Sequence, residues 1–506
     1  MRQLVLAIDA GTTGVRSMIF KPDGEVVAKA YREFQNHFPN PSWVEQDAES
    51  WWSATCQTLA QCFKSGVNPD DIIGASVTNQ RETVVPVDES GHPLRRAIVW
   101  QDRRTVDQCN WIREQVPAEE IYSTTGLTVD PYFTAPKIIW IKQNEPDVFR
   151  NAHKFLLVHD YIVFRLTGRT ITDHSNASRT MMFDISRAEW SDTLLDSFGV
   201  PADKLPEPLI SGSHVDMVSK KAAKESGLCE ATAVLTGGGD QQCAALGVGV
   251  VRRGRIKSTT GTGTFMLAFS NSPRLDSKRR VLCSRHVVPG AFVVEASMFT
   301  TGSALRWFRD QLGSTEVGIA EDRGVDPYEI LTEGAAAVPA GSEGIIHIPH
   351  LVGAGAPYWN PHARGVFAGL ALGHTRAHMV RSILEGVSYE MRTNLEVMRE
   401  LKLPTEEVRV TGGAARSEFW MQVQADVLGI PVVRTEMEEA TALGAAILAC
   451  NGVGLFKSVA HAAEEMVRPS EPLKPAKENR AVYERGFERY KELYNAVSGM
   501  TWDYSA

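Results

Sequence analysis

Two aspartates, Asp9 and Asp240, each end a short apolar run and stand beside glycines. A carboxylate at the end of a buried strand can help to hold a magnesium ion, directly or through water. It can also accept a proton from a hydroxyl nucleophile, as in phosphoryl transfer to an alcohol. The structural alternative is that each aspartate caps the following helix, a position that Asp favours. The open glycine run 237–239 before Asp240 favours a chemical role for that carboxylate.

Three glycine-rich turns each follow an expected strand, and two of them carry threonines. The turns are Gly11-Thr12-Thr13-Gly14, Gly261-Thr262-Gly263 and Gly412-Gly413-Ala414. Glycine lets the backbone approach a ligand closely, and neighbouring N–H groups can cradle phosphate oxygens. The alternative is that these are only tight turns. Neither G-x-x-x-x-G-K-[ST] nor G-x-G-x-x-G occurs, so the sequence does not support a P-loop, a protein-kinase glycine loop or a Rossmann fingerprint.

Two polar-aromatic clusters also follow apolar runs. They are Arg81-Glu82 and Trp100-Gln101-Asp102-Arg103. Polyol hydroxyls are bound by charged, fork-like groups, while an aromatic face covers the C–H side of the ligand. The alternative is a salt-bridge patch on the surface, and the spacing alone does not separate the two interpretations.

The elements that must position these residues alternate between strands and helices. We expect strands over 4–8, 16–20, 26–30 and 72–78, with a helix over 49–63. A similar order recurs from residue 233, where a strand, an aspartate and a helix start precede a strand–glycine turn–strand unit over 256–267. This predicts an α/β protein of two related halves, 1–248 and 249–506. The charged tail over 477–497 predicts a packed terminal helix.

Composition excludes several classes of protein. The 506 residues carry 53 basic and 61 acidic side chains, and a formal net charge of −8 argues against nucleic-acid binding. Seven scattered cysteines without a C-x-x-C pair disfavour a disulfide framework or a cysteine zinc site, and they fit a reducing, cytoplasmic location. No signal peptide or membrane insertion is expected, because Asp9 breaks the first apolar run and no long apolar run follows. The pairs His347/His350 and His374/His378 lack cysteine or carboxylate partners at ligand spacing, so no transition metal is expected.

These residues lie within segments that, taken together, resemble the FGGY carbohydrate kinases along nearly the whole chain. The segments are AIDAGTTGVRSMIF, VTNQRET, AIVWQDRRT, TGLTVDPYF, NASRTMMFD, GGGDQQCAALG, KSTTGTGTFML, GAGAPYWNPHARG, VRVTGGA and EATALGAA. The resemblance implies two ribonuclease-H-like (actin-like ATPase) domains with an interdomain cleft. It also implies ATP-dependent phosphorylation of a polyol or sugar hydroxyl, with Mg²⁺.

The resemblance carries roles to individual positions. Asp240 matches the family's general base, and Asp9 and Asp240 match metal-associated aspartates. Substrate contacts are expected at Arg81, Glu82, Trp100, Tyr132, Asp240, Gln241 and Phe265. Nucleotide contacts are expected at Thr12, Thr13, Gly14, Arg16, Gly261, Thr262, Gly302, Arg306, Gly413, Ala414 and Ser417. Two of these depart from the pattern, because bacterial glycerol kinases usually have glutamine in place of Arg306 and often asparagine in place of Ser417.

Within the family the segments most resemble glycerol kinases, which implies conversion of glycerol to glycerol 3-phosphate. The stretches 283–307 and 416–420 are more similar to xylulose or autoinducer kinases. A ketose kinase such as a xylulose kinase, or an autoinducer kinase, is therefore the alternative function. A non-catalytic, ATP-dependent switch of the actin-like type is the alternative from a different class. Asp240 and the polyol cluster disfavour that switch. A homo-oligomer is compatible with the sequence.

Overall fold

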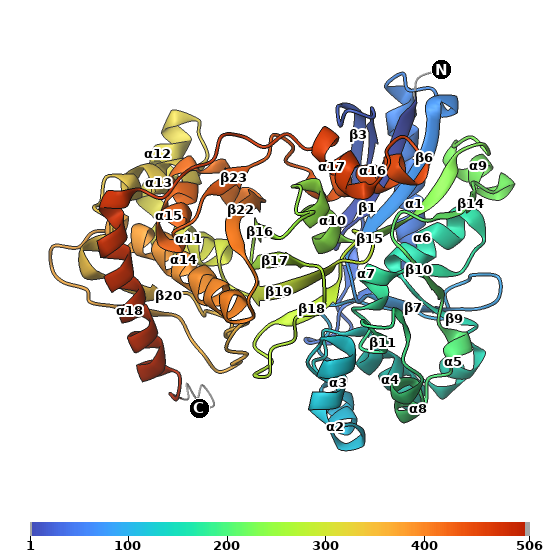
Figure 1. The fold of residues 1–506 in the computed structure, drawn as a ribbon, viewed down its shortest axis with the longest axis horizontal. Helices are drawn as coiled ribbons and strands as arrows, with labels where there is room; N and C mark the ends of the chain where they lie inside the picture. The colour runs from blue at the N-terminus through green and yellow to red at the C-terminus, as the bar shows by residue number, and fades with distance from the viewer. Residues whose placement is uncertain (1–2, 501–506) are drawn as a thin grey trace.

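The computed structural model describes residues 3–500 and contains two six-stranded sheets, one in each half of the chain (Figure 1). The first sheet has the order β14 (His214–Met217), β15 (Ala233–Gly239), β6 (Ile72–Asn79), β1 (Leu4–Ala10), β2 (Gly14–Phe20) and β3 (Val26–Glu33). The second has the order β18 (Leu282–Arg285), β19 (Phe292–Met298), β17 (Thr264–Ser270), β16 (Gly254–Thr260), β22 (Thr405–Thr411) and β23 (Val432–Arg434). The predicted strands are confirmed, each extended by a few residues.

Five strands of each sheet repeat one topology, whereas the sixth strands, β14 and β18, lie at opposite ends of it. In the first, β1 pairs antiparallel with β2 and β2 with β3, while β1 pairs parallel with β6 and β6 with β15. In the second, β16, β17 and β19 form the antiparallel run, while β16, β22 and β23 run parallel. The predicted relation between the two halves is therefore confirmed at the level of strand order.

Helices cover both faces of the first sheet. Successive side chains of a strand point to opposite faces, so Leu4, Leu6 and Ile8 of β1 pack with α1 (Ala48–Lys64) and α6 (Val158–Thr167). Val5 and Ala7 pack instead in the cluster that contains residues of α10 (Asp240–Gly247), α16 (Ala440–Gly452) and α17 (Val459–Met466). Two late helices of the chain thus lie on the first sheet (Figure 1).

The two halves meet closely where α10 and α16 cross. A Cβ atom at Gly247 would lie 1.8 Å from the Ala440 carbonyl oxygen, and one at Gly444 would lie 1.9 Å from the Cys243 carbonyl oxygen. Glycine is needed at both positions because any side chain would push the helices apart. This contact fixes the start of α10, and with it Asp240, relative to α16.

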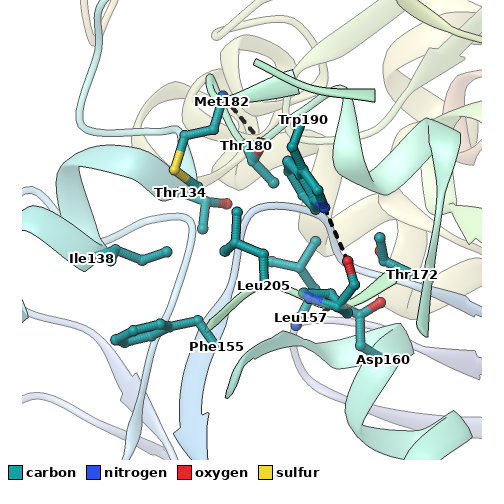
Figure 2. A pocket seen from close by; sticks show the side chains of 11 residues that line it. Thr134, Ile138, Phe155, Leu157, Asp160, Thr172, Thr180, Met182, Trp190 and Leu205 are labelled. Carbon is teal, nitrogen blue, oxygen red and sulfur yellow. Dashed lines mark hydrogen bonds between the residues drawn. The ribbon is translucent and has the colours of Figure 1, made fainter. Parts of the chain in front are cut away.

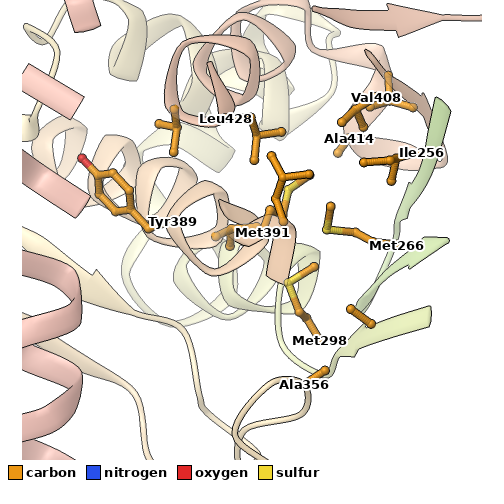
Figure 3. Close-up of a cluster of buried hydrophobic side chains, with 14 of the residues drawn as sticks. Ile256, Met266, Met298, Ala356, Tyr389, Met391, Val408, Ala414 and Leu428 are labelled. Atoms are coloured by element: carbon orange, nitrogen blue, oxygen red, sulfur yellow. The ribbon is translucent and has the colours of Figure 1, made fainter. Parts of the chain in front are cut away.

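The second sheet carries its own core (Figure 3). Ile256, Met266 and Met298 of the sheet pack with Met391 of α14 (Arg376–Glu400) and Leu428 of α15 (Glu418–Leu428). Outside them α18 (Arg480–Val497) buries the aromatic face predicted for the tail, namely Tyr483, Phe487, Tyr490 and Tyr494. The interpretation of the tail as a packed terminal helix is confirmed.

Smaller elements complete the chain. A five-stranded sheet of the first half contains β4 (Asn36–His37), β5 (Glu45–Gln46), β8 (Ala97–Ile98), β7 (Val84–Val87) and β9 (Lys154–Leu157). Two-stranded sheets pair β10 (Ile171–Asp173) with β13 (Glu207–Leu209), β11 (Phe183–Asp184) with β12 (Glu189–Trp190), and β20 (Ile346–Ile348) with β21 (Val366–Ala368). The remaining α-helices are α2 (Val106–Gln115), α3 (Ala118–Thr125), α4 (Thr134–Asn144), α5 (Pro146–Asn151), α7 (His174–Ala177), α8 (Asp192–Phe198), α9 (Lys220–Ser226), α11 (Gly302–Leu312), α12 (Ser314–Arg323) and α13 (Pro327–Ala336). Among residues 3–500, no helix is long and apolar enough to cross a membrane.

Candidate active site

Parallel strands gather the charged residues at one edge of the first sheet. Asp9 of β1 pairs with Thr78 of β6, and Gly239 of β15 pairs with Asn79. The residues that follow β6 and β15 therefore emerge beside Asp9, and they are Arg81 and Asp240. This edge is where ligands bind in open α/β sheets, outside the carboxyl ends of the strands.

Asp240 is the first residue of α10 and does not cap it, because the N-cap residue is Gly239. One carboxylate oxygen accepts a hydrogen bond from the backbone N–H of Gln241 at 2.7 Å. The Nε atom of Arg81 lies 3.4 Å from the same oxygen, and the Asp240 side chain is 30% exposed. Burial raises its pKa, while Arg81 and Lys257 act in the opposite direction. The carboxylate is thus held in place and remains accessible, as a general base must be.

The predicted polyol-binding residues of the first half converge beside Asp240. Arg81 and Glu82 are only 2% and 1% exposed, which excludes the surface-patch interpretation for these two. The Arg81 guanidinium lies 3.5 Å from the Tyr132 hydroxyl, and the Tyr132 ring meets Trp100 edge-to-face at 5.6 Å. Glu82 has a φ of 64°, a conformation that costs energy for a residue with a side chain and is enriched at functional sites.

The neighbours of Trp100 have structural roles instead. Asp102 is fully buried and accepts hydrogen bonds from the Val44 N–H and from the Arg104 guanidinium. Arg103 forms a surface ion pair with Asp130. The second polar cluster of the sequence therefore contributes its tryptophan to the site, whereas its charged members hold the loop around it.

The second half faces this cluster with three side chains on one side of its sheet. In the register of the sheet, Leu267 pairs with both Lys257 and Glu295, and Phe265 occupies the next position on the same face. Lys257 donates a hydrogen bond to the side-chain oxygen of Gln241, and Glu295 pairs with Arg81 at 2.8 Å. Phe265 and Gln241 are therefore brought to the cluster, although they come from different halves.

Three residues of this cluster were missed by sequence reasoning, namely Arg179, Lys257 and Glu295. Lys257 and Glu295 are fully buried charges, and Glu295 stands within an otherwise apolar or small-residue strand, which was the available signal. Burial lowers the pKa of Lys257 to about 7, although Glu295 and Asp240 favour its charged form. Arg179 stands within the segment NASRTMMFD, so the motif was recognised while the residue was not.

The threonine turn of the first half lies between the polyol cluster and α16. Thr12 accepts a hydrogen bond from the Trp100 indole N–H at 2.9 Å, and the turn closes through the Gly11 N–H and the Gly14 carbonyl. Arg16 reaches across to Glu439, which precedes α16, with a 2.5 Å ion pair. Thr13 remains exposed beside Tyr31. The predicted Thr12, Thr13 and Arg16 are thus at least partly exposed around this turn, whereas Gly14 is buried against β3.

The matching turns of the second half also share one edge. Thr259 pairs with Thr411, so the turn at Gly261 and Thr262 lies beside the turn at Gly413. Gly302 starts α11 and packs so closely that a Cβ atom there would lie 2.1 Å from the Gly261 carbonyl oxygen. The predicted residues Gly261, Thr262, Gly302, Gly413 and Ala414 are therefore grouped.

Two further predicted nucleotide residues flank this group. Arg306 is exposed on α11, one turn after Gly302. The Ser417 hydroxyl caps α15 by accepting from the Trp420 N–H at 3.2 Å, so it has a structural role whether or not it meets a ligand. Nucleotide contacts by either residue remain predictions.

Asp9 lies in an acidic environment that suits a cation. Burial raises the pKa of Asp9 to about 7, Arg16 opposes the rise, and the Asp240 and Glu439 carboxylates add to it. A divalent cation relieves such repulsion, and Mg²⁺ is usually bound by one or two carboxylates together with substrate phosphates. In residues 3–500 no cluster of three or more His, Cys, Asp or Glu side chains forms a ready-made metal site. The residues present fit a cation that arrives with phosphate ligands.

A small, mostly apolar pocket lies elsewhere in the first half (Figure 2). Ile138, Phe155 and Leu157 line it, and the Trp190 indole N–H donates to the Pro206 carbonyl at 3.0 Å. None of the predicted site residues lines this pocket. The predicted site residues gather at the strand ends instead, away from this pocket.

Comparison with known proteins identifies the family. Residues 4–247 match the N-terminal domain of the FGGY family of carbohydrate kinases, and residues 256–452 match its C-terminal domain. The chain belongs to this family. It is 38% identical to a glycerol kinase from Deinococcus radiodurans over 92% of each chain, and 36% identical to glycerol kinase 2 from Thermotoga maritima over 98% of this chain and 99% of that relative.

A solved structure gives the same result for the fold. The xylulose kinase from Rhodospirillum rubrum superposes with a TM-score of 0.91 at 29% identity, covering 98% of this chain and 99% of that one. The predicted two-domain α/β fold of the family is confirmed. The chain is therefore a carbohydrate kinase, an enzyme that uses ATP to phosphorylate a small sugar or polyol.

Proposed function

We propose that this kinase transfers the γ-phosphoryl group of ATP to a hydroxyl of glycerol. The observation that carries the proposal is the buried Arg81–Glu82 pair beside Tyr132 and the exposed edge of Asp240. The Arg81 guanidinium can donate hydrogen bonds to adjacent hydroxyls, and the Glu82 carboxylate can accept them. The Trp100 ring offers an apolar surface to the carbon chain. Relatives named glycerol kinases, at 36–38% identity over nearly the full chain, support the same substrate.

Asp240 is the proposed general base. It would take the proton of the attacking hydroxyl as the new O–P bond forms and the bond to the leaving ADP breaks. Burial raises its pKa above the ordinary value of 3.8, which makes the carboxylate a better proton acceptor. Little covalent work is left to the protein in phosphoryl transfer, so positioning and charge neutralisation provide most of the rate.

The nucleotide is proposed to lie between the halves, with its phosphates against the Thr12–Thr13 and Gly261–Thr262 turns. Backbone N–H groups of glycine turns suit phosphate oxygens, and Gly413 and Ala414 bound the same edge. Asp9 and Asp240 would hold Mg²⁺, which neutralises phosphate charge when bound. Free cysteines throughout the chain support the proposal of a cytoplasmic location.

A ketose kinase is the second candidate, favoured by one observation. The structure of Rhodospirillum rubrum xylulose kinase matches at a TM-score of 0.91. Because overall shape does not decide specificity, the ligand-contacting residues carry more weight, and an unpaired buried polar group costs about 1–3 kcal/mol. The Arg81, Glu82 and Tyr132 set therefore favours glycerol.

A substrate screen tests the proposal directly. ADP release by the purified chain would be measured with glycerol, erythritol, xylulose, ribulose and dihydroxyacetone, with magnesium and ATP present. We expect the highest kcat/KM for glycerol. A higher value for a ketose would replace glycerol and keep the kinase assignment. ATP turnover that no polyol or sugar stimulates would instead favour a non-catalytic actin-like switch.

A further inference from the structure

Four buried charges connect the two halves at the proposed polyol site. Arg81 and Arg179 come from the first half, as does Glu82, whereas Glu295 stands in the middle of β19 in the second sheet. All four side chains are at most 1% exposed. We call them the charge quartet.

The quartet orients Arg81 by a two-point contact. The Nη1 atom of Arg81 donates to Glu295 at 2.8 Å, and Nη2 donates to the other Glu295 oxygen at 3.1 Å. Such a contact fixes the plane of the guanidinium as well as its position. It leaves the Nε edge directed at Asp240, 3.4 Å away, and Nη2 within 3.5 Å of the Tyr132 hydroxyl.

Arg179 completes the quartet from the opposite side. Its Nε donates to Glu82 at 2.6 Å, and its Nη1 lies 3.5 Å from Glu295. The guanidinium is packed near the rings of Tyr132 and Phe133, with centroids 5.5 and 5.2 Å away. Each arginine thus contacts both carboxylates, and no member can move without leaving a buried charge unpaired.

The charge of Glu295 is maintained by its partners. Burial alone would favour the neutral acid, but Arg179 and Arg81 hold the pKa of Glu295 at about 2. The Ser297 hydroxyl donates a further hydrogen bond to it at 3.2 Å. Glu295 is therefore an ionised, fixed acceptor at neutral pH.

We propose that Glu295 is a positioning residue for the polyol: from the second half, it holds the Arg81 guanidinium so that its Nε edge faces Asp240, where the hydroxyls bind. Polyol affinity then depends on contact between the halves, because the Arg81 guanidinium is aligned only while Glu295 is hydrogen-bonded to it. This inference rests on the proposed polyol kinase function and extends it to a residue that does not itself touch the substrate.

Two variants separate positioning from charge balance. Glu295→Gln removes the charge, and Glu295→Asp keeps the charge but shortens the side chain by one methylene, so that it cannot reach both nitrogens of Arg81. We expect both variants to raise the polyol KM at least tenfold and to leave the ATP KM within twofold. The matched control is Glu390→Gln, a buried carboxylate of α14 that pairs with His350 away from the site. It should leave both KM values unchanged.

A structural readout accompanies the kinetics. Thermal unfolding is measured for each variant. For Glu295→Asp we expect a near-normal Tm, because the variant keeps the charge that pairs with the two arginines. An unchanged polyol KM in both variants would overturn the inference. Equal rises in the KM for ATP and for polyol, accompanied by a lower Tm in Glu295→Asp, would also overturn it, since they indicate a purely structural role.

The outcome is independent of which substrate the screen selects. The KM is measured for the polyol or ketose that the wild-type chain phosphorylates best. A wild type inactive toward glycerol but active toward a ketose contradicts the proposed substrate, while the variant comparison still tests Glu295.

Discussion

The two sheets share a strand order but present different chemistry at their carboxyl ends. At the first sheet, strands β1, β6 and β15 lead to Asp9, Arg81 and Asp240, which are charged and largely buried. The second ends at Gly261 and Gly413, within turns of glycine, threonine and alanine. One topology therefore carries a charged edge in the first half and a glycine-rich edge in the second, where Arg306 on α11 and Arg416 after the Gly413 turn are exposed.

The difference follows from what each edge is proposed to meet. A neutral polyol needs donors, acceptors and a base at defined positions, which only side chains supply. A polyphosphate already carries charge, so backbone N–H groups and close approach suffice, and a side chain would occupy the space of the ligand. The charged edge should accordingly control chemistry and polyol binding, whereas the glycine edge, together with the Thr12–Thr13 turn of the first half, should control ATP binding.

Removing the base from the charged edge should have the largest effect. Asp240→Asn preserves the shape but not the proton acceptor. We expect kcat to fall by about 10²–10⁴ or more, the usual contribution of general-base catalysis. ATP binding, followed by equilibrium titration, should persist. Asp23→Asn, at an exposed hairpin turn, is the control and should be near normal. Near-normal turnover in Asp240→Asn would remove this carboxylate from the mechanism.

Removing the hydroxyl-binding groups should have the next largest effect, and a selective one. Arg81→Ala and Glu82→Ala each delete a buried charged contact, worth about 1–3 kcal/mol or more. We expect the polyol KM to rise by about 10- to 100-fold while the ATP KM changes little. Steady-state kinetics with each substrate varied in turn checks this. Equal effects on both substrates would show that the charged edge does not discriminate between them.

Much of the contrast between the two edges could be predicted from the sequence, because strands and turns depend mainly on neighbouring residues. The strands around Asp9 were predicted because an apolar run ends near glycine, and the turn at Gly261 was predicted because it echoes Gly11-Thr12-Thr13-Gly14. The contact between Arg81 and Glu295 could not be, since the two residues are more than two hundred positions apart and only the packing of the halves joins them. The position of α16 on the first sheet was missed for the same reason. The boundary at 248/249 stays a prediction of the sequence.

The glycine edge is tested by adding a single methyl group. In Gly302→Ala the Cβ atom would lie 2.1 Å from the Gly261 carbonyl oxygen, so the turn must shift. We expect the ATP KM to rise about tenfold, equivalent to about 1.4 kcal/mol, with the polyol KM nearly unchanged. Gly318→Ala in α12 is the matched control, because nothing lies within 4 Å of the added carbon. A larger effect on the polyol than on ATP would reverse the assignment of the two edges.

The buried His286 of the second half should affect stability in acid and leave activity at neutral pH unchanged. The buried His286 ring bonds through Nε2 to the Val250 carbonyl at 2.9 Å and accepts the Val287 N–H at Nδ1, which requires the neutral ring. Burial lowers the pKa of His286 from 6.5 to about 4. Between these values the unfolded chain binds the proton and the folded chain does not, so the stabilisation is present above pH 6.5 and is lost as the pH falls toward 4. The loss approaches about 1.4 kcal/mol per pH unit from this group.

His286→Gln, which keeps a donor and an acceptor without a titrating ring, should be less stable than wild type at pH 7. The difference between the two should narrow as the pH falls from 6.5 to 4. Thermal unfolding of both proteins across this range measures it, and an unchanged difference would show that His286 does not make the fold acid-sensitive. Such a result would not change the roles assigned to the charged and glycine edges, because neither role depends on the titration of this ring.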